Sequence, residues 1–513
     1  MLRKDNGKQI SGFDQYYYDK VIPQHHLLRN IAQHIDFSFI RNLLADQYSA
    51  DYGRPAEDPV FLFKICLLEY LYTLSDVQVI SHIQVNLAYR WFLDLNIDDE
   101  LPDDSTISYF RVKRVGLEKF QDIFKRLVDQ CIEHGFISAT SKRSIMDSTH
   151  IIADVAIPTW LSLVRQAYRR VLIDVSSINQ EISQKFEQRM IDLWEELKGK
   201  TRDEKLPVIL QLASELVDIA EPLLHEEKQP NEALVTLKKV ISDRDEDATD
   251  RLISVVDTHA RTGHKSDMRK IQGYKDHIMI DEETEIITAV KVTPANAEDG
   301  DQLIDLIKQF QDHYGFLPKE LSADKGYWFG KNLRFLQENN MIGHISWMKT
   351  KQQVSGLFTP EHFHFDLENM QVTCPNGIVS HSYRDRTKAK EDRAGYEFRF
   401  TKTQCQDCPL RAQCTTSKSI RNVFISDYYA EFQQAREHYK TDEYKEARKS
   451  RWLIERRHAD KVRNHGLRRS RYRGLERAYI HALMSTIASN VKRMTKLIME
   501  KRKQERSALL VTS

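Results

Sequence analysis

Short strand-like runs separated by helical stretches constrain the fold of this chain more than any other feature of its sequence. The first run, RSIMDSTHIIADVA, covers residues 143–156, and the second, at residues 273–296, has the alternation and polar turn of an antiparallel hairpin. A third run ends at Asp324, and a fourth covers residues 342–348. Helical patterns lie between these runs, so the sequence predicts an α/β sheet.

Acidic residues occur where these predicted strands end. Asp147 follows Ile145 and Met146, and Asp324 follows the short run KELSA. Ligands collect where the strands of an α/β sheet end, so we expect Asp147 and Asp324 to meet in a functional site. Asp257, which follows two valines, is a rival for the position of Asp147, whereas Asp281 suits a hairpin turn and Asp299 a helix start.

A basic stretch near the C-terminus, residues 451–475, contains a single glutamate, Glu455. Arg451, Glu455, His458 and Val462 follow helical spacing and would share one stripe, with the carboxylate facing inward. A carboxylate beside a phosphate backbone is repelled unless a divalent cation lies between them, which favours a metal ligand in a DNA-processing site. The other interpretation is a solvated basic helix with one incidental glutamate.

The overall charge and the N-terminus narrow the class of protein. Lys plus Arg number 76 and Asp plus Glu 75 in 513 residues, so any affinity for nucleic acid must come from local patches. The first residues lack the apolar region of a signal peptide, and no run approaches the length of a membrane span. We therefore expect a cytoplasmic protein that makes no membrane contact.

Two further regions read as helical. Asp58 and Pro59 begin the apolar run VFLFKICLLEYLY, the expected core of an all-α N-terminal domain at residues 1–138. Within it, the basic segment TISYFRVKR is either a DNA-recognition helix or an ordinary surface helix. A charged helical insertion is expected at about residues 156–253, and residues 501–513 form an expected frayed tail.

Four of the six cysteines lie between the last predicted strand and Glu455. Cys374 occurs in TCPNG, and Cys405, Cys408 and Cys414 occur in CQDCPLRAQC. Such a set can supply four thiolates to a structural zinc ion in a zinc-ribbon-like insertion at residues 349–427. Reduced thiols in an irregular insertion are the alternative.

Several motifs together resemble the DDE transposases of bacterial insertion sequences. These are IMDSTH, GYKDHIMID, VTPAN, SADKGYWFG and ERRHADKVRNHGLRRSRYRGL, with GRPAEDPVFLFKICLLEYLYTLSD, LAYRWFLDL and LPDDSTISYFR similar to the helical domain that one subgroup carries. The resemblance spans about residues 25–493. It implies an RNase H-like catalytic core, here at residues 139–348 and 428–500, interrupted by the helical and the cysteine-containing insertions.

The resemblance also implies the site. Asp147, Asp324 and Glu455 match the acidic triad that binds two Mg²⁺ ions, with Mn²⁺ as a possible substitute. Residues expected to contact DNA are Lys275, Arg451, Lys461, Arg463, Arg468, Arg469, Arg471 and Arg473. The family usually has a lysine seven residues after the glutamate; this chain has Val462 there, flanked by Lys461 and Arg463.

The function implied is cleavage and joining of DNA at the terminal inverted repeats of the element that encodes the protein. Its partners would be double-stranded DNA, both repeats and target, and a second copy of the chain in a DNA-bound homodimer, associated with the bacterial nucleoid. Two alternatives stay open: a DNA-binding protein that has lost catalysis, and a metal-dependent nuclease without strand transfer.

Overall fold

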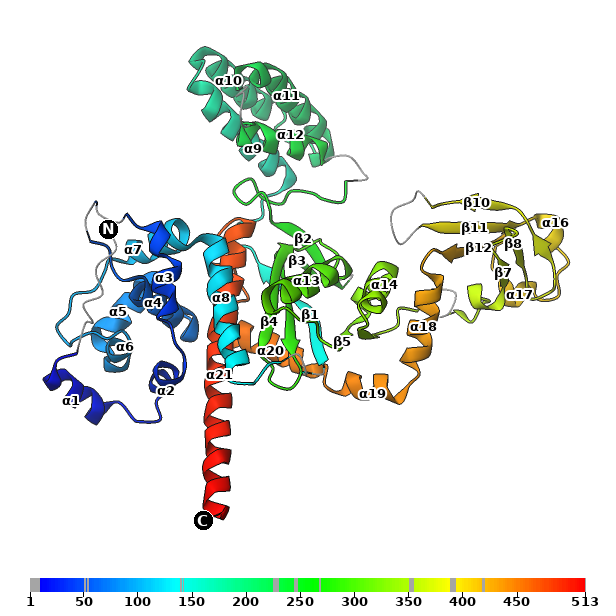
Figure 1. Cartoon of the computed structure of the whole chain (residues 1–513). Helices are drawn as coiled ribbons and strands as arrows, with labels where there is room; N and C mark the ends of the chain where they lie inside the picture. Colours follow the sequence, from blue (N-terminus) through cyan, green and yellow to red (C-terminus); the bar gives the residue numbers. More distant parts are fainter. Residues whose placement is uncertain are drawn as a thin grey trace.

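The chain is built around one mixed β-sheet, to which helices and two insertions are attached (Figure 1). The structure is a computed structural model that describes residues 10–49, 52, 55–138, 141, 143–224, 230–243, 248–266, 269–349, 355–387, 394–417 and 420–512. The N-terminal region is helical, and the rest of the chain mixes helices and strands, as the sequence predicts.

The sheet contains β1 (Arg143–Ile152), β2 (Arg261–Ser266), β3 (Arg269–Asp281), β4 (Ile287–Pro294), β5 (Glu320–Ala323) and β6 (Ile342–Ile345). β3 pairs antiparallel with β1 and β4, whereas β1 pairs parallel with β5, and β5 with β6. The order across the sheet is β4, β3, β1, β5, β6, with β2 paired to the first residues of β3. The predicted hairpin and the strands around it are confirmed, whereas the polar strand β2 is not expected from the sequence.

Gly273, the first residue of the GYK motif, lies where β1, β2 and β3 meet. Its φ is +149°, and a Cβ at this position would lie 2.2 Å from the carbonyl oxygen of Ile151. No side chain fits there, so only glycine allows β3 to approach β1 this closely.

The N-terminal region contains α1 (Gly12–Val21), α2 (Leu27–His34), α3 (Phe39–Leu43), α4 (Pro59–Leu71), α5 (Asp76–Val85), α6 (Leu87–Phe92), α7 (Asp104–Tyr109) and α8 (Gly116–Glu133). The predicted helix start at Asp58 is confirmed, since its carboxylate accepts hydrogen bonds from the first N–H groups of α4; Ser75 and Gln78 form a capping box on α5. These helices pack against α21 (Leu475–Thr512), which passes between them and the sheet (Figure 1).

One hydrophobic core joins these parts. It includes Phe63 and Phe124 from the N-terminal helices, Ile280 from β3, and Leu483 and Ile487 from α21. The N-terminal helices therefore share their core with the sheet. α21 continues to Thr512, so the expected fraying of residues 501–513 is wrong for the described residues, which are mostly good helix formers.

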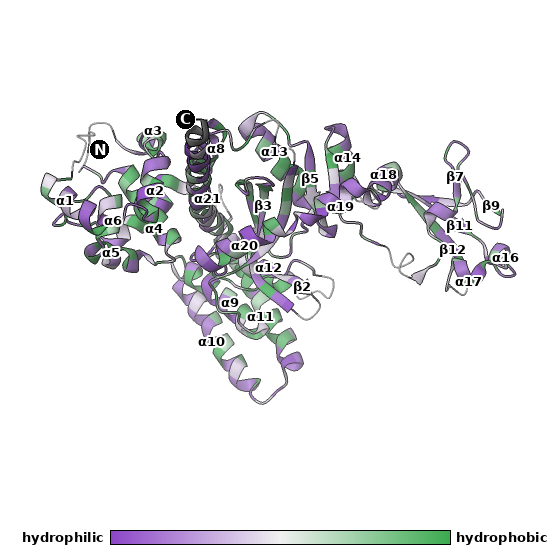
Figure 2. Cartoon of the chain, turned by 90° about the horizontal axis from the view of Figure 1, so that it is seen from below, coloured by the Kyte–Doolittle hydropathy of each residue, from purple (hydrophilic) through white to green (hydrophobic). Residues whose placement is uncertain are grey.

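Two insertions project from the sheet in different directions (Figures 1 and 2). Between β1 and β2, the helices α9 (Trp160–Ser176), α10 (Gln180–Glu196), α11 (Arg202–Leu223) and α12 (Glu232–Ser242) pack on one another around a core of their own. Figure 2 shows hydrophilic and hydrophobic residues interleaved along these helices, the pattern of an amphipathic bundle.

The second insertion follows β6 and contains two three-stranded sheets. One consists of β7 (His364–Asp366), β8 (Gln371–Thr373) and β9 (Val379–Ser380); the other consists of β10 (Tyr383–Asp385), β11 (Gly395–Phe400) and β12 (Arg421–Ser426). The short helices α16 (Lys402–Cys405) and α17 (Arg411–Cys414) connect β11 to β12.

The remaining helices lie against or near the sheet. They are α13 (Leu303–Tyr314), α14 (Gly330–Glu338), α18 (Tyr429–Tyr439), α19 (Asp442–Lys449) and α20 (Trp452–Asn464). Of the helices in the described part of the chain, none combines the length and the apolar character that crossing a membrane requires.

Candidate active site

Asp147 and Asp324 lie side by side because of the register between two parallel strands. Ile145 of β1 is opposite Ser322 of β5, and each aspartate stands two residues further along its chain. Successive side chains of a strand alternate between its faces, so both carboxylates emerge on the same face. The expectation that these two acids meet is supported by this pairing.

The two carboxylates are held in the same way. Oδ1 of Asp147 accepts a hydrogen bond from the N–H of Ser148 at 2.8 Å, and Oδ1 of Asp324 accepts one from the N–H of Gly326 at 2.7 Å. Their Oδ2 atoms lie 3.4 Å and 3.9 Å from Nη2 of Arg451. One arginine, the residue that directly precedes α20, thus reaches both acids.

This cluster carries more negative than positive charge. Burial raises the pKa of Asp147 to about 6; the Arg451 guanidinium opposes the rise, and the carboxylates of Asp324 and Asp299 add to it. One guanidinium at these distances does not fully neutralise the negative charge of the two carboxylates. Hard carboxylate oxygens with excess negative charge are the donor set that Mg²⁺ and Mn²⁺ prefer.

Asp299 is an acid of this cluster that the sequence interpretation assigned only to a helix start. Its side chain caps no helix; instead Oδ1 accepts a hydrogen bond from Nζ of Lys275 at 2.9 Å. Lys275 also donates to the carbonyl oxygen of Ala297. Lys275 and Thr293 are cross-strand partners in the β3–β4 hairpin, and this register carries the segment after β4 back toward Lys275. The ammonium group expected to contact DNA is thus engaged by Asp299.

Tyr327 stands beneath the acids, three residues after Asp324. Its side chain is fully buried, and its hydroxyl has no hydrogen-bond partner among the described residues. Burial raises the pKa of Tyr327 well above its ordinary value, and Asp147, Asp299 and Asp324 raise it further. The sequence interpretation missed this residue, although its place in the SADKGYWFG motif is a signal.

Glu455 lies on α20, one helical turn after Arg451. The buried side of α20 is formed by Ile454 and His458, and His458 packs near the backbone of Asp147. Glu455 itself is exposed, so the expectation that its carboxylate faces inward is wrong: it stands at the edge of the buried stripe. The structure therefore brings Asp147 and Asp324 together and places Glu455 on the helix that supplies their arginine.

The basic residues expected to contact DNA divide into two groups. Arg463, Arg468, Arg469 and Arg473 are exposed, although Arg468 and Arg473 each donate a hydrogen bond to a backbone carbonyl of the segment 150–154. This leaves an accessible basic surface along the segment after α20.

For Lys461 and Arg471, the expectation of a DNA contact is wrong. Lys461 is fully buried and pairs with Asp276, so it cannot reach DNA. Arg471 donates hydrogen bonds to the carbonyl oxygens of Leu74 and Glu69 and lies over the ring of Tyr70. It ties the segment to the N-terminal helices.

The basic segment TISYFRVKR presents only part of its length to solvent: Ser108, Tyr109 and Lys113 are exposed, whereas Arg111 is buried. It forms α7 and a following π-helical turn, Phe110–Val115. Arg111 in that turn is buried and pairs with Glu69 at 2.6 Å and with Asp76. A guanidinium committed to two carboxylates is unavailable to a DNA phosphate.

The rival acids have structural positions. Asp257 is buried and accepts hydrogen bonds from the Tyr274 hydroxyl and the Ala260 N–H, at the turn before β2. Asp281 accepts from Thr284 in the hairpin turn, as expected. Neither belongs to the cluster around Arg451.

Two other sites deserve comparison with the acid cluster. Glu320, His344 and Glu443 have ligand atoms within 4.8 Å of one another, but Arg143 donates two hydrogen bonds to Oε2 of Glu320 and so offsets its charge.

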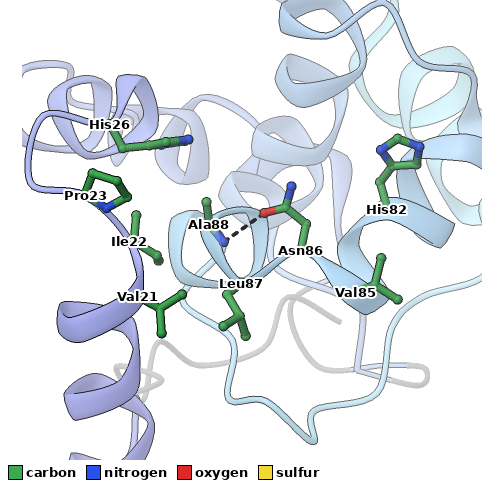
Figure 3. Close-up of a pocket in the computed structure, with 9 residues that line it drawn as sticks. All are labelled: Val21, Ile22, Pro23, His26, His82, Val85, Asn86, Leu87 and Ala88. Carbon is green, nitrogen blue, oxygen red and sulfur yellow. Dashed lines mark hydrogen bonds between the residues drawn. The ribbon is translucent and has the colours of Figure 1, made fainter.

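A hollow of about 530 Å³ among α1, α5 and α6 is lined by Val21, Ile22, Pro23, His26, His82, Val85, Asn86, Leu87 and Ala88 (Figure 3). It contains no acidic side chain.

Comparison with protein families identifies the chain. Residues 16–113 match a transposase domain (DUF772), and residues 373–495 match a transposase DDE domain. Both matches are to transposase families, and together they support a DDE transposase of an insertion sequence. No curated protein and no solved structure matches it.

The two matches cover different parts of the transposase. The first spans the N-terminal helices through α7, and the second spans the four clustered cysteines, Arg451 and Glu455. Asp147 and Asp324 lie between the matched segments, so their assignment depends on the register and contacts described above. The transposase is accordingly an enzyme that acts on DNA.

Proposed function

We propose that this transposase cleaves and joins phosphodiester bonds at the terminal inverted repeats of its own element, using Asp147, Asp324 and Glu455 in an RNase H-like core. The mixed sheet, with antiparallel strands on one side of β1 and parallel strands on the other, supports that fold. The observation that carries the proposal is the contact of Arg451 with both aspartates, since it joins two strands to the helix that bears Glu455.

The donor chemistry fits a pair of Mg²⁺ ions. Asp147 and Asp324 each keep Oδ2 free of backbone hydrogen bonds, and Glu455 adds an exposed carboxylate that has no hydrogen-bond partner among the described residues. When bound, Mg²⁺ stabilises negative charge on the attacking and leaving oxygens of the phosphodiester. Mn²⁺ has the same ligand preference and could replace it.

The chain's own residues orient and balance this site. The N–H groups of Ser148 and Gly326 fix the two aspartates, so neither must reorganise when DNA arrives. Arg451 offsets their repulsion while the site holds no cation. The exposed arginines after α20 would neutralise backbone phosphates and position the duplex without reading its sequence.

The proposed substrate complex contains two element ends and a target duplex bound by a homodimer, since both ends must be cut and joined together. A duplex carrying one terminal repeat, incubated with purified protein and Mg²⁺, tests the chemistry. We expect nicking at the repeat end, followed by joining of the cleaved 3′ end to target DNA.

Two substitutions test the site. Asp324→Asn and Glu455→Gln should each abolish nicking while leaving DNA binding unchanged. Asp312→Asn and Glu476→Gln, at exposed positions on α13 and α21, are matched controls and should nick at the wild-type rate. Wild-type nicking by Asp324→Asn would overturn the assignment. Cleavage without joining would indicate a nuclease, and binding without cleavage by the wild type would indicate a DNA-binding protein.

A further inference from the structure

Four cysteines from separate elements of the second insertion line one small cavity. Cys374 follows β8, Cys405 ends α16, Cys408 lies in the following turn, and Cys414 ends α17. All four are free thiols, partly buried, around a space of about 30 Å³. Residues 374 and 414 are thus brought to the same point by two different sheets.

A buried arginine lines the same cavity. Arg421, the first residue of β12, is only 6% exposed. It donates one hydrogen bond, from Nη2 to the carbonyl oxygen of Phe358 at 2.7 Å, and its Nε has no partner. In the part of the chain that the structure describes, no carboxylate forms a salt bridge with it. Burying a charge without a counter-charge is costly, so a negative group is expected in this cavity.

We propose that Cys374, Cys405, Cys408 and Cys414 bind one structural zinc ion as thiolates, with Arg421 as the counter-charge of the centre. Four thiolates and Zn²⁺ carry a net charge of about −2, which a neighbouring guanidinium partly neutralises. Each thiol gives its proton to solvent when its sulfur binds the metal. This centre is separate from the carboxylate site and does not depend on the proposed cleavage chemistry.

The small core of the insertion explains why it needs a metal. Its buried hydrophobic residues are Phe363, Val372, Phe398, Phe400, Val423 and Ile425. A core of that size supplies little stability, and small units of this kind are commonly held by disulfides or metals. Cys374 belongs to the β7–β8–β9 side, whereas the other three belong to the connection between β11 and β12, so zinc joins the two sheets.

The few polar links between the sheets are consistent with this role. The Ser380 hydroxyl donates to the carbonyl oxygen of Arg399 at 2.6 Å, and Nε2 of Gln404 donates to that of Val379 at 3.3 Å. The sulfurs themselves are not yet at ligand spacing: among the described residues, Glu320, His344 and Glu443 are the one group of three ligand atoms within 4.8 Å. Zinc binding therefore contracts the cysteine cluster.

Metal analysis of the full-length protein, purified without chelator, tests the proposal. We expect about one zinc per chain, lost in Cys405→Ser and Cys408→Ser and retained in Cys131→Ala, a buried cysteine outside the cluster. Cobalt substitution should give the absorption bands of tetrahedral thiolate coordination. Zinc-free wild type whose four clustered thiols all react with a thiol reagent would overturn the site.

Arg421 has its own test, which does not require loss of a ligand. Arg421→Met should weaken zinc affinity by about 10- to 100-fold in competition with a chromogenic chelator. Arg399→Met, a partly exposed arginine on the neighbouring strand β11, is the matched control and should bind zinc like the wild type. Unchanged affinity in Arg421→Met would remove the counter-charge role. Asp324→Asn should keep its zinc, which separates this centre from the cleavage site.

Discussion

Lys461 and Asp276 form a fully buried ion pair, with Nζ of the lysine 2.6 Å from Oδ2 of the aspartate. Lys461 lies on α20 and Asp276 on β3, so the pair joins the helix that carries Glu455 to the centre of the sheet. Removing one partner of a buried pair leaves the other charge uncompensated.

The first prediction follows from that pair. Lys461→Met should lower the free energy of unfolding by about 3 to 5 kcal/mol, and Lys461→Met with Asp276→Leu should recover much of the loss. Thermal denaturation of the three proteins measures this. Arg463→Ala, at the exposed neighbouring basic residue, should keep wild-type stability and weaken DNA binding. A stable Lys461→Met protein that binds DNA poorly would contradict the structure.

Tyr327 gives the second prediction. Its buried hydroxyl has no partner among the described residues, so Tyr327→Phe should raise the free energy of unfolding by about 1 kcal/mol in the absence of divalent cations. Denaturation in the presence of a chelator provides the measurement. Lower stability in Tyr327→Phe would mean that the hydroxyl is satisfied within the fold. Tyr314→Phe, whose hydroxyl donates to the carbonyl oxygen of Thr288, is the comparison and should lose stability.

Arg451 gives the third prediction, through cation binding. Arg451→Gln removes the guanidinium that faces Oδ2 of both Asp147 and Asp324. Mn²⁺ should then bind more tightly, by about tenfold, because its competitor for the carboxylates is gone. Titration calorimetry with Mn²⁺ tests this, with Asp324→Asn expected to bind more weakly. Equal affinity in all three proteins would place the metal elsewhere.

His481 gives a prediction about pH. Burial between α21 and α4, together with a smaller contribution from the Arg471 charge, lowers its pKa to about 3, while Nδ1 faces the Tyr70 hydroxyl at 3.0 Å. Folding therefore favours the neutral ring. The corresponding stability is fully present above pH 6.5, the ordinary value, and is lost as pH falls toward 3.

The size of that loss can be measured. Between pH 6.5 and pH 5, His481 should contribute a loss of about 2 kcal/mol. Melting temperatures measured across this range should fall more steeply for the wild type than for His481→Gln, which cannot be protonated. His313→Gln should change the pH profile less than His481→Gln does, because His313 is only half-buried. Parallel profiles for wild type and His481→Gln would contradict the assignment.

The strands and the helix starts were the predictable part of the fold, because local chemistry decides them. The run at residues 143–152 reads as a strand, the hairpin shows alternation and a polar turn, and Asp58 and Ser75 carry complete capping signals. Asp147 and Asp324 could be proposed as neighbours because both follow strands of one sheet.

The side chains of α20 and Asp299 were harder to predict because their partners are distant in sequence. Each residue of a helix turns the side-chain direction by about 100°, so Lys461 and Arg463, two residues apart, point to nearly opposite sides, one buried and the other exposed. Asp299 joins the acids only through the cross-strand register that places Lys275 nearby. The role proposed for Arg421 follows only from its position in the cysteine-lined cavity, which the sequence does not show.

The position of α21 sets the order in which the protein can mature. Residues as late as Met494 and Ile498 complete the apolar core that α4 and α8 begin. A ribosome releases those residues long after the N-terminal helices, so these helices leave it with part of their apolar surface still open. Assembly of the core thus waits until α21 has been synthesised, and chains stopped before α21 would be substrates for proteases.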